Sequence, residues 1–279
     1  TWYSEIDQHV LAAFCDHRVG GKVVLPGTAL AEMALFAGCA TLGTDQIELR
    51  DVDLLAPVVL SRTTMTEVRT RANAEQATIR IAARPRGTDA PLRPHLQTRF
   101  FRAVADGPQE PPPDARPRPG DRGSDRLYHS ARRVGLNYGP GFALCRRVRT
   151  VRDGMVEVFL DPVEQAGKAE ISTLLDIPGT DAAFHGLIVA LEGSETASDR
   201  MGYIPVHIER LTLLRPRGRV ASARIEVTRL GKRSVVARFA LFDAEGYGLT
   251  LMEGVRFQAV RLQREISLAH HSFRQILLP

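Results

Sequence analysis

The sequence contains few of the residues that build covalent or metal-linked frameworks. Of its 279 residues only three are cysteine, Cys15, Cys39 and Cys145, and no two of them form a CxxC pair. An odd number of widely spaced cysteines argues against a disulfide framework or a zinc site, and it fits a reducing compartment such as the cytoplasm. We therefore expect all three to be small buried hydrophobic side chains.

Long apolar runs and aromatic residues are scarce as well. No run of about 18 apolar residues exists, so a transmembrane helix is not expected. Residues 1–10 do not have the basic region followed by an apolar region that is typical of a signal peptide. Aromatic residues make up 6% of the chain and do not alternate with its arginine-rich runs, which argues against a stacking groove for nucleic acid. The net charge of +5 then indicates a solvated arginine-rich surface or attraction to an acidic protein partner.

What the sequence does contain is typical of a globular protein. It is 44% hydrophobic and 25% charged, which is enough apolar material for a substantial core. The length fits one large domain or two of moderate size. The chain begins with threonine instead of methionine, and we expect it to be an excised part of a longer chain or a processed product.

One stretch divides the sequence into two halves. Residues 105–123 are rich in proline, glycine, aspartate and arginine and nearly free of large apolar side chains. Such a composition predicts an extended linker that buries no surface. The halves are then residues 1–104 and 124–265, and residues 266–279, with a pair of adjacent histidines, form a tail that serves as a linker or docking surface.

The first half reads as strands around one helix. Residues 3–7 and 10–19 are expected to be strands, and a run of further strand-like segments follows residue 46. Between them, residues 28–40 place apolar side chains at i, i+3, i+4 and i+7, which predicts a helix, with Thr28 as its N-cap.

The second half repeats this plan. A short helix is expected over residues 126–135, a hairpin at Asp153–Gly154, a central apolar helix over residues 180–193, and consecutive strands after it. One helix wrapped by consecutive antiparallel strands, twice in tandem, is an α+β layer design.

Three side chains are candidates for acid–base chemistry. His17 stands at a strand end, Asp181 opens the second central helix, and His185 lies four residues further on the same helical face. If the halves are related by pseudo-symmetry, a histidine from one meets a carboxylic acid from the other. Each also has an ordinary explanation: a structural strand histidine, a favourable charge in a first helical turn and a core histidine. The three could also bind a metal ion, but no further carboxylate or histidine shows ligand spacing.

Three motifs occur in order along the chain. His17, Gly21 and Pro26 form H-xxx-G-xxxx-P, residues 135–142 read GLNYGPGF, and Asp181 and His185 form D-xxx-H. Any one of them is weak, but together the sequence resembles the dehydratase domains of modular polyketide synthases. The resemblance covers almost the whole chain and includes the flanking residues DHRV around His17, LY ahead of the second motif, and YIPVHIERLTL in the second half.

The resemblance implies a fold, a reaction and partners. Members have a double hotdog fold, with two central helices each wrapped by an antiparallel sheet. They remove water from a β-hydroxyacyl chain that an acyl carrier protein presents as a thioester on its phosphopantetheine arm, and they use no cofactor and no metal. Expected partners are the acyl carrier protein, neighbouring synthase domains and a second copy in a homodimer, with no nucleic acid and no membrane.

The resemblance also assigns roles at the site. His17 would be the general base that takes the α-proton, and Asp181 the general acid that protonates the departing hydroxyl. An apolar tunnel would raise the pKa of Asp181 by desolvation and keep it protonated. His185 would orient Asp181, and Tyr138 would hydrogen-bond the β-hydroxyl or the acid.

Backbone roles follow for the glycine and proline positions. Gly139 and Pro140 would shape the turn after Tyr138. The N–H of Gly21 would approach the thioester oxygen, helped by the following helix, whose entry Pro26 sets. Candidates to line the tunnel, although each also fits core packing, are Val24, Leu25, Met33, Phe184 and Leu187.

One departure leaves alternatives open. Members usually carry His-Pro and an apolar pair before the catalytic aspartate, whereas this chain reads DIPGTD over residues 176–181. Asp176 is therefore a weaker second candidate for the acid. The same pair of groups on this scaffold could also isomerise, epimerise or cyclise a substrate, and a catalytically silent domain that docks carrier proteins is the remaining alternative.

Overall fold

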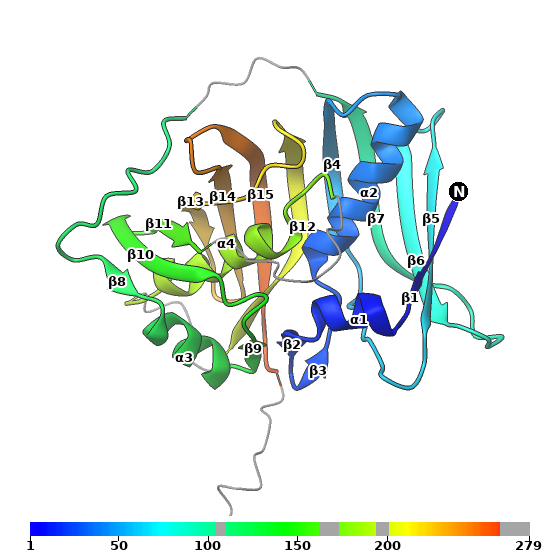
Figure 1. Ribbon diagram of the computed structural model, residues 1–279, viewed down its shortest axis with the longest axis horizontal. Helices are drawn as coiled ribbons and strands as arrows, with labels where there is room; N and C mark the ends of the chain where they lie inside the picture. Colours follow the sequence, from blue (N-terminus) through cyan, green and yellow to red (C-terminus); the bar gives the residue numbers. More distant parts are fainter. Residues whose placement is uncertain (104–109, 162–172, 194–200, 263–279) are drawn as a thin grey trace, which may run out of the picture.

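The computed structural model describes residues 1–103, 110–161, 173–193 and 201–262. The predicted tail, residues 266–279, and the beginning of the predicted linker lie outside these ranges. Two central helices, α2 and α4, lie against a large antiparallel sheet (Figure 1). The helices are α1 (Gln8–Phe14), α2 (Gly27–Leu42), α3 (Asp125–Arg133) and α4 (Ile177–Ala190).

Strands from both halves build the main sheet. In the described part of the chain its order is β1-β5-β6-β7-β4-β12-β15-β14-β13-β11-β10-β8, and a smaller sheet has the order β3-β2-β9. The strands of the first half are β1 (Trp2–Ile6), β2 (His17–Val19), β3 (Lys22–Val23), β4 (Ile47–Leu54), β5 (Thr66–Asn73), β6 (Thr78–Pro85) and β7 (Arg93–Arg102). Those after it are β8 (Arg122–Gly123), β9 (Leu136–Tyr138), β10 (Cys145–Arg152), β11 (Met155–Leu160), β12 (Gly202–Leu213), β13 (Ser222–Leu230), β14 (Ser234–Phe242) and β15 (Gly248–Val260).

The halves are joined at two places in these sheets. Antiparallel pairing of β4 with β12 makes the main sheet continuous, and pairing of β2 with β9 closes the smaller sheet. Helices α2 and α4 contact one another, and each packs on the strands of its own half (Figure 1). The α+β prediction of two central helices, each wrapped by antiparallel strands, is confirmed.

Both central helices are apolar on nearly all sides, because each is enclosed by the sheet and by the other helix. Ala34 and Leu35 of α2 and Ala182 and Ala183 of α4 are fully buried. No helix among the described residues is long and apolar enough to cross a membrane.

The first predicted segment is wrong in part. The expected strand over residues 10–19 is instead helix α1 followed by the short strand β2. Asp7 caps this helix by accepting hydrogen bonds from the N–H groups of His9 and Val10, and Leu11 and Phe14 pack into the core. An apolar run this short has no periodicity that separates a strand from a helix, so the capping aspartate was the better signal.

The starts of the central helices also differ from the prediction. Pro26, and not Thr28, is the N-cap of α2, and the Thr28 hydroxyl donates to the Ile177 carbonyl of the other helix at 3.3 Å. Helix α4 begins at Ile177, with Asp176 as its N-cap, so Asp181 lies in the second turn and not at the opening. Proline inside the first turn allowed the helix to start earlier than its apolar spacing indicated.

The described part of the linker lies against the second half. Arg149, which is 6% exposed, donates to the carbonyl oxygens of Asp114 and Arg116 and pairs with the carboxylate of Asp121. This pairing holds the pKa of Asp121 well below its usual range. Pro113 is buried as well. The expectation that the linker buries no surface is therefore wrong, because arginine side chains of the sheet hold it down.

Candidate active site

A tight hairpin holds His17 in place. Strands β2 and β3 are joined through Gly20 and Gly21, whose φ angles of 58° and 78° lie in the left-handed region. Two consecutive positive φ angles are what a two-residue hairpin turn matching the strand twist requires, and glycine adopts them without strain. Gly21 is thus placed in the turn of the hairpin, beyond the strand residue His17.

The second half fixes the other edge of β2. His17 pairs with Tyr138 across the β2–β9 ladder. The N–H of Gly139 donates to the Asp16 carbonyl at 2.8 Å, and the N–H of Gly141 donates to the Asp16 carboxylate at 2.9 Å. A Cβ at Gly139 would collide with that carboxylate, which explains glycine at this position. The Tyr-Gly-Pro turn is therefore a clamp on the segment that carries His17.

The His17 ring has a defined tautomer. It is 7% exposed, and its Nδ1 lies 2.8 Å from the Val24 carbonyl oxygen, which can only accept. Nδ1 must therefore carry the proton in the neutral ring, and Nε2 is left with its lone pair. Nε2 lies 3.6 Å from Oδ2 of Asp181. The strand histidine of the first half thus directs a proton acceptor at the helix of the second.

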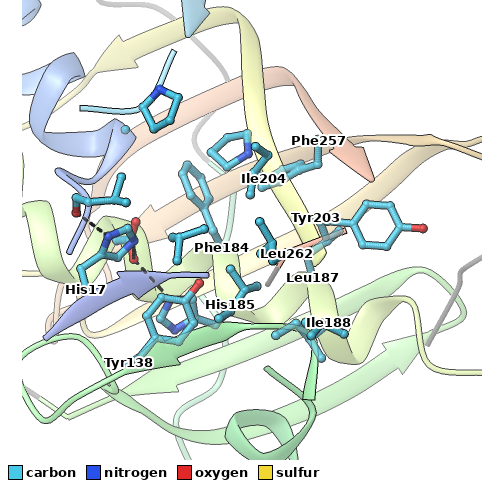
Figure 2. Close-up of a pocket in the computed structure, with 18 of the residues that line it drawn as sticks. His17, Tyr138, Phe184, His185, Leu187, Ile188, Tyr203, Ile204, Phe257 and Leu262 are labelled. Atoms are coloured by element: carbon cyan, nitrogen blue, oxygen red, sulfur yellow. Dashed lines mark hydrogen bonds and ion pairs between the residues drawn. The ribbon is translucent and has the colours of Figure 1, made fainter. Parts of the chain in front are cut away.

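Helix α4 supplies the other two predicted side chains. Nε2 of His185 lies 3.3 Å from Oδ2 of Asp181, one helical turn away. The Tyr138 ring stacks on the His185 ring with centroids 3.8 Å apart. Burial raises the pKa of Tyr138 well above its usual value, so its phenol stays protonated. Figure 2 shows His17, Tyr138 and His185 gathered at one end of a cavity.

The ionisation of Asp181 differs from the expectation. Burial opposes its negative charge, but the positive charge of a protonated His17 and the hydrogen bond with His185 together outweigh burial, and the pKa of Asp181 is lowered. The expected rise was wrong because it counted desolvation without the two imidazoles. Burial lowers the pKa of His185 despite its contact with Asp181, so this ring is neutral near pH 7.

The start of α4 is fixed by carboxylates from both halves. The Asp176 carboxylate accepts from the N–H groups of Gly179 and Val220 at 3.3 and 2.9 Å. The Glu32 carboxylate of α2 accepts from the N–H groups of Leu174 and Leu175, which precede α4, at 2.9 and 2.8 Å. Asp176 is thus occupied as a helix cap and is not brought to His17, which removes it as the alternative acid.

The cavity beside the dyad has a volume of about 760 Å³ and a mainly apolar wall. Beyond His17, Tyr138 and His185, the residues Phe184, Leu187, Ile188 and Ile204 follow along its length, and Tyr203 lies at the far side (Figure 2). A cavity of this size and character suits an elongated apolar ligand with its polar end at the dyad. Of the predicted lining residues, those on this wall are Val24, Leu25, Phe184 and Leu187.

The remaining predicted lining residue, Met33, packs against the hydrophobic core.

The structure also identifies site residues that the motifs did not single out. Gly27, the first residue of α2, lines the cavity, so the N-terminal end of this helix borders it. Tyr128 of α3 contacts His185, and Asp16 clamps the glycine turn. Their signals were present, since Gly27 follows Pro26 and Tyr128 belongs to the LY pair.

Among the residues that the structure describes, no group of three or more histidine, cysteine, aspartate or glutamate side chains is arranged to hold a metal ion. His17 and His185 both contact Oδ2 of Asp181 through Nε2, at 3.6 and 3.3 Å.

Two family models match this sequence. One described as "Polyketide synthase dehydratase domain" matches residues 1–84, and one described as "Polyketide synthase dehydratase N-terminal domain" matches residues 105–265. The squalestatin hexaketide synthase of a Phoma species is 25% identical over 97% of the chain, which spans 11% of that protein's length. The pikromycin polyketide synthase component PikAII of Streptomyces venezuelae is 36% identical over 54% of the chain, which spans 4% of it.

Solved structures share the fold. A dehydratase domain of a trans-AT polyketide synthase from Brevibacillus brevis superposes with a TM-score of 0.77 at 21% identity, covering 92% of this chain and 93% of that one. The dehydratase domain from the CurF module of curacin polyketide synthase gives 0.78 at 22% identity, covering 92% of each chain. These are double hotdog domains, and the predicted fold is confirmed. With the longer family model covering more than half of its residues, the chain belongs to the polyketide synthase dehydratase domains.

Proposed function

We propose that this domain removes water from a 3-hydroxyacyl thioester and releases the α,β-unsaturated thioester. The observation that carries the proposal is the approach of His17 Nε2 to Asp181 Oδ2, 3.6 Å apart, in a cavity that both halves enclose. Two buried groups of opposite acid–base character, aimed at one point, are what a β-elimination needs.

His17 acts as the base. Its Nδ1–H donates to the Val24 carbonyl, so the Nε2 lone pair is available to accept the proton on the α-carbon of the substrate. The α-proton of a thioester is only weakly acidic, so a base must be held directly against it, and a positioned neutral imidazole can take it. The Cα–H bond breaks, its electron pair forms the new double bond, and the proton moves to Nε2.

Asp181 acts as the acid, and the dyad conserves its proton. In the reactive form the single proton shared by the pair lies on Asp181, which passes it to the β-hydroxyl as the Cβ–O bond breaks and water leaves. An apolar chain in the cavity excludes water, so the proton passes to the substrate oxygen and not to solvent. After elimination, the imidazolium of His17 faces the carboxylate, and proton transfer between them restores the neutral pair.

Backbone groups at the start of α2 stabilise the charge that develops on the thioester oxygen. Gly27 lines the cavity at the helix N-terminus, where free N–H groups and the helix dipole favour negative charge. This assigns to Gly27 the role expected of Gly21, while Gly21 shapes the hairpin that carries His17. Pro26 ends the approach to the helix, and its carbonyl accepts from the N–H of Ala29 at 3.0 Å.

Tyr138 and the cavity wall orient the substrate. The protonated phenol of Tyr138 is stacked on His185 and donates to the β-hydroxyl, and Gly139 and Pro140 hold its turn. The apolar wall binds the acyl chain. A phosphopantetheine arm of an acyl carrier protein is the proposed carrier, within a larger synthase. A related dehydratase domain, that of PpsC from Mycobacterium tuberculosis, is known in complex with C12:1-CoA, whose thioester arm has the same chemistry.

The test is product analysis with 3-hydroxyacyl pantetheine thioesters. His17→Ala and Asp181→Asn are each expected to lower the rate of water loss by about 10³-fold with the fold intact. His129→Ala, at an exposed histidine on α3, is the matched control and is expected to retain activity. Full activity in either site variant would overturn the proposal. So would a wild-type product that is a ring or a shifted alkene without the conjugated alkene as its precursor.

A further inference from the structure

We propose that Tyr128 is a positioning residue that sets the tautomer of His185 and, through it, the proton on Asp181. By donating its hydroxyl proton to Nδ1 of His185, it keeps the His185 proton on Nε2, where it faces the carboxylate. The inference rests on the proposed function, because it concerns the acid of that reaction.

The direction of the Tyr128 hydroxyl follows from its neighbours. Tyr128 is 8% exposed on α3, and its Oη lies 2.8 Å from the backbone nitrogen of Cys145. An amide N–H can only donate, so Oη accepts this bond and its own proton must point elsewhere. Nδ1 of His185 lies 3.5 Å away as the available acceptor, a separation that bound substrate can shorten.

The state of His185 then follows. Burial lowers its pKa, so the ring is neutral and carries one N–H. With Nδ1 accepting from Tyr128, the proton lies on Nε2, 3.3 Å from Oδ2 of Asp181. The titratable groups that face this ring are Tyr128 from α3, Tyr138 from β9, Asp181 from α4 and, through Asp181, His17 from β2.

The tautomer decides what Asp181 can do. A donor at Nε2 binds one lone pair of Oδ2 and leaves the proton of Asp181 free for the substrate hydroxyl. With the opposite tautomer, an Nε2 lone pair would face the carboxyl, and the proton of Asp181 would be held by His185 and not by the leaving group. Tyr128 therefore keeps the acid directed at the substrate without touching it.

Glutamine at position 185 gives an internal control for this reasoning. A glutamine amide always presents N–H donors, so it needs no partner to fix a tautomer. The contribution of the Tyr128 hydroxyl to turnover should therefore depend on histidine at position 185.

The experiment is a double-mutant cycle with an added NMR measurement. Wild type, Tyr128→Phe, His185→Gln and the double variant are compared by kcat, KM and pH profile. ¹⁵N chemical shifts of the histidine rings report which nitrogen is protonated. We expect wild-type His185 to be the Nε2–H form. Tyr128→Phe should lose this preference and about tenfold in kcat, as for one lost hydrogen bond of ordinary strength, with KM unchanged.

In the His185→Gln background, Tyr128→Phe should change kcat by less than about twofold. The cost of the unpaired Cys145 N–H is common to both backgrounds and cancels. Tyr247→Phe, at a half-exposed tyrosine, is the control for hydroxyl removal. An Nδ1–H tautomer in the wild type, or an equal kcat loss in both backgrounds, would overturn the proposal. The NMR result does not need turnover, so it stands apart from a failure of the proposed function.

Discussion

Helix α2 follows Pro26, a residue without a side-chain acceptor, whereas helix α4 follows Asp176, whose carboxylate accepts from Gly179 and Val220. The difference matches what each helix contributes. The N-terminus of α2 borders the cavity at Gly27, where we propose that its N–H groups stabilise charge on the substrate. The N-terminus of α4 is capped by Asp176, and this helix contributes side chains from its second turn onward. In the proposed reaction the two equivalent helices therefore have complementary chemical tasks.

The two side chains proposed as acid and base are also held by different means. Asp181 stands on a helix that is buried on nearly every side, while His17 stands on a short hairpin outside the main sheet. The hairpin gains its rigidity from the other half, through β9 and the Asp16 clamp. Asp181 is therefore placed by a buried helix whose start both halves fix, and His17 by a hairpin that the other half holds.

The largest expected effect comes from the contact between the helices. Glu32→Ala removes the acceptor for the N–H groups of Leu174 and Leu175, which are then buried without partners. We expect a loss of about 3 kcal/mol in the free energy of unfolding. Glu32→Gln, which keeps one carbonyl acceptor, should lose about half as much. Chemical denaturation measures both, and equal stability of Glu32→Ala and wild type would show that α2 does not hold the start of α4.

A second pair of variants compares how the helices pack. Gly38 of α2 lies against the Ile47 side chain. A Cβ added at Gly186 of α4 would lie only 2.6 Å from the Val158 side chain. Alanine at either position places its Cβ against these side chains, so that a side chain or the helix must shift, which costs up to about 2 kcal/mol. Only Gly186→Ala should also reduce kcat, because it follows His185 directly. Thermal unfolding and turnover assays distinguish the two, and an equal kcat loss in Gly38→Ala would contradict the separate roles.

The helix starts give a smaller contrast. Asp176→Ala should destabilise the protein by about 1–2 kcal/mol, the usual cost of a lost N-cap. Thr28→Val removes only the hydroxyl that donates to the Ile177 carbonyl and should cost about 1 kcal/mol. Urea titrations would rank the two. A larger loss for Thr28→Val would mean that the contact between the helices, and not the cap, fixes the start of α4.

The smallest effect concerns pH, and it depends on one buried histidine of each half whose pKa is lowered, His95 and His185. Burial lowers the pKa of His95, whose Nδ1 contacts the Ala56 carbonyl at 2.9 Å, and that of His185. The unfolded chain then binds these protons more readily than the folded one. This contribution to stability is complete above about pH 6.5 and declines as the pH falls below it. His95→Gln and His185→Gln should each lose less stability between about pH 7.5 and 5.5 than wild type. Denaturation at both pH values measures this, and curves parallel to wild type would refute it.

Periodicity and turn chemistry predicted most elements of the fold. The apolar spacing within α2 and α4 predicted these two helices, and Asp153–Gly154 predicted the turn after β10. Local sequence was sufficient in both cases, because local geometry determines these elements. Helix α1 was missed because seven residues are too few to show a period. The linker was misjudged because the arginines that bind it come from strands far along the chain.

The site shows the same limit. His17, Asp181 and His185 were identified from motifs, and the structure brings them together. The predicted direction of the pKa shift of Asp181 was wrong, because this shift depends on distances between side chains that the spacing of residues in the sequence does not encode. Tyr128 and Glu32 were not assigned roles for the same reason: their partners lie in other elements, and only the packed structure shows them.

The pairing of β2 with β9 has a consequence for how the protein folds. It joins segments such as those of Asp16 and Gly141, which are 125 residues apart in the chain. Contacts of such long sequence separation carry a large loop-closure cost and form slowly. Each half can collapse onto its own helix first, but His17 reaches Asp181 only when the halves dock. We therefore expect the proposed activity to return during refolding with this late docking event, separately from the return of secondary structure.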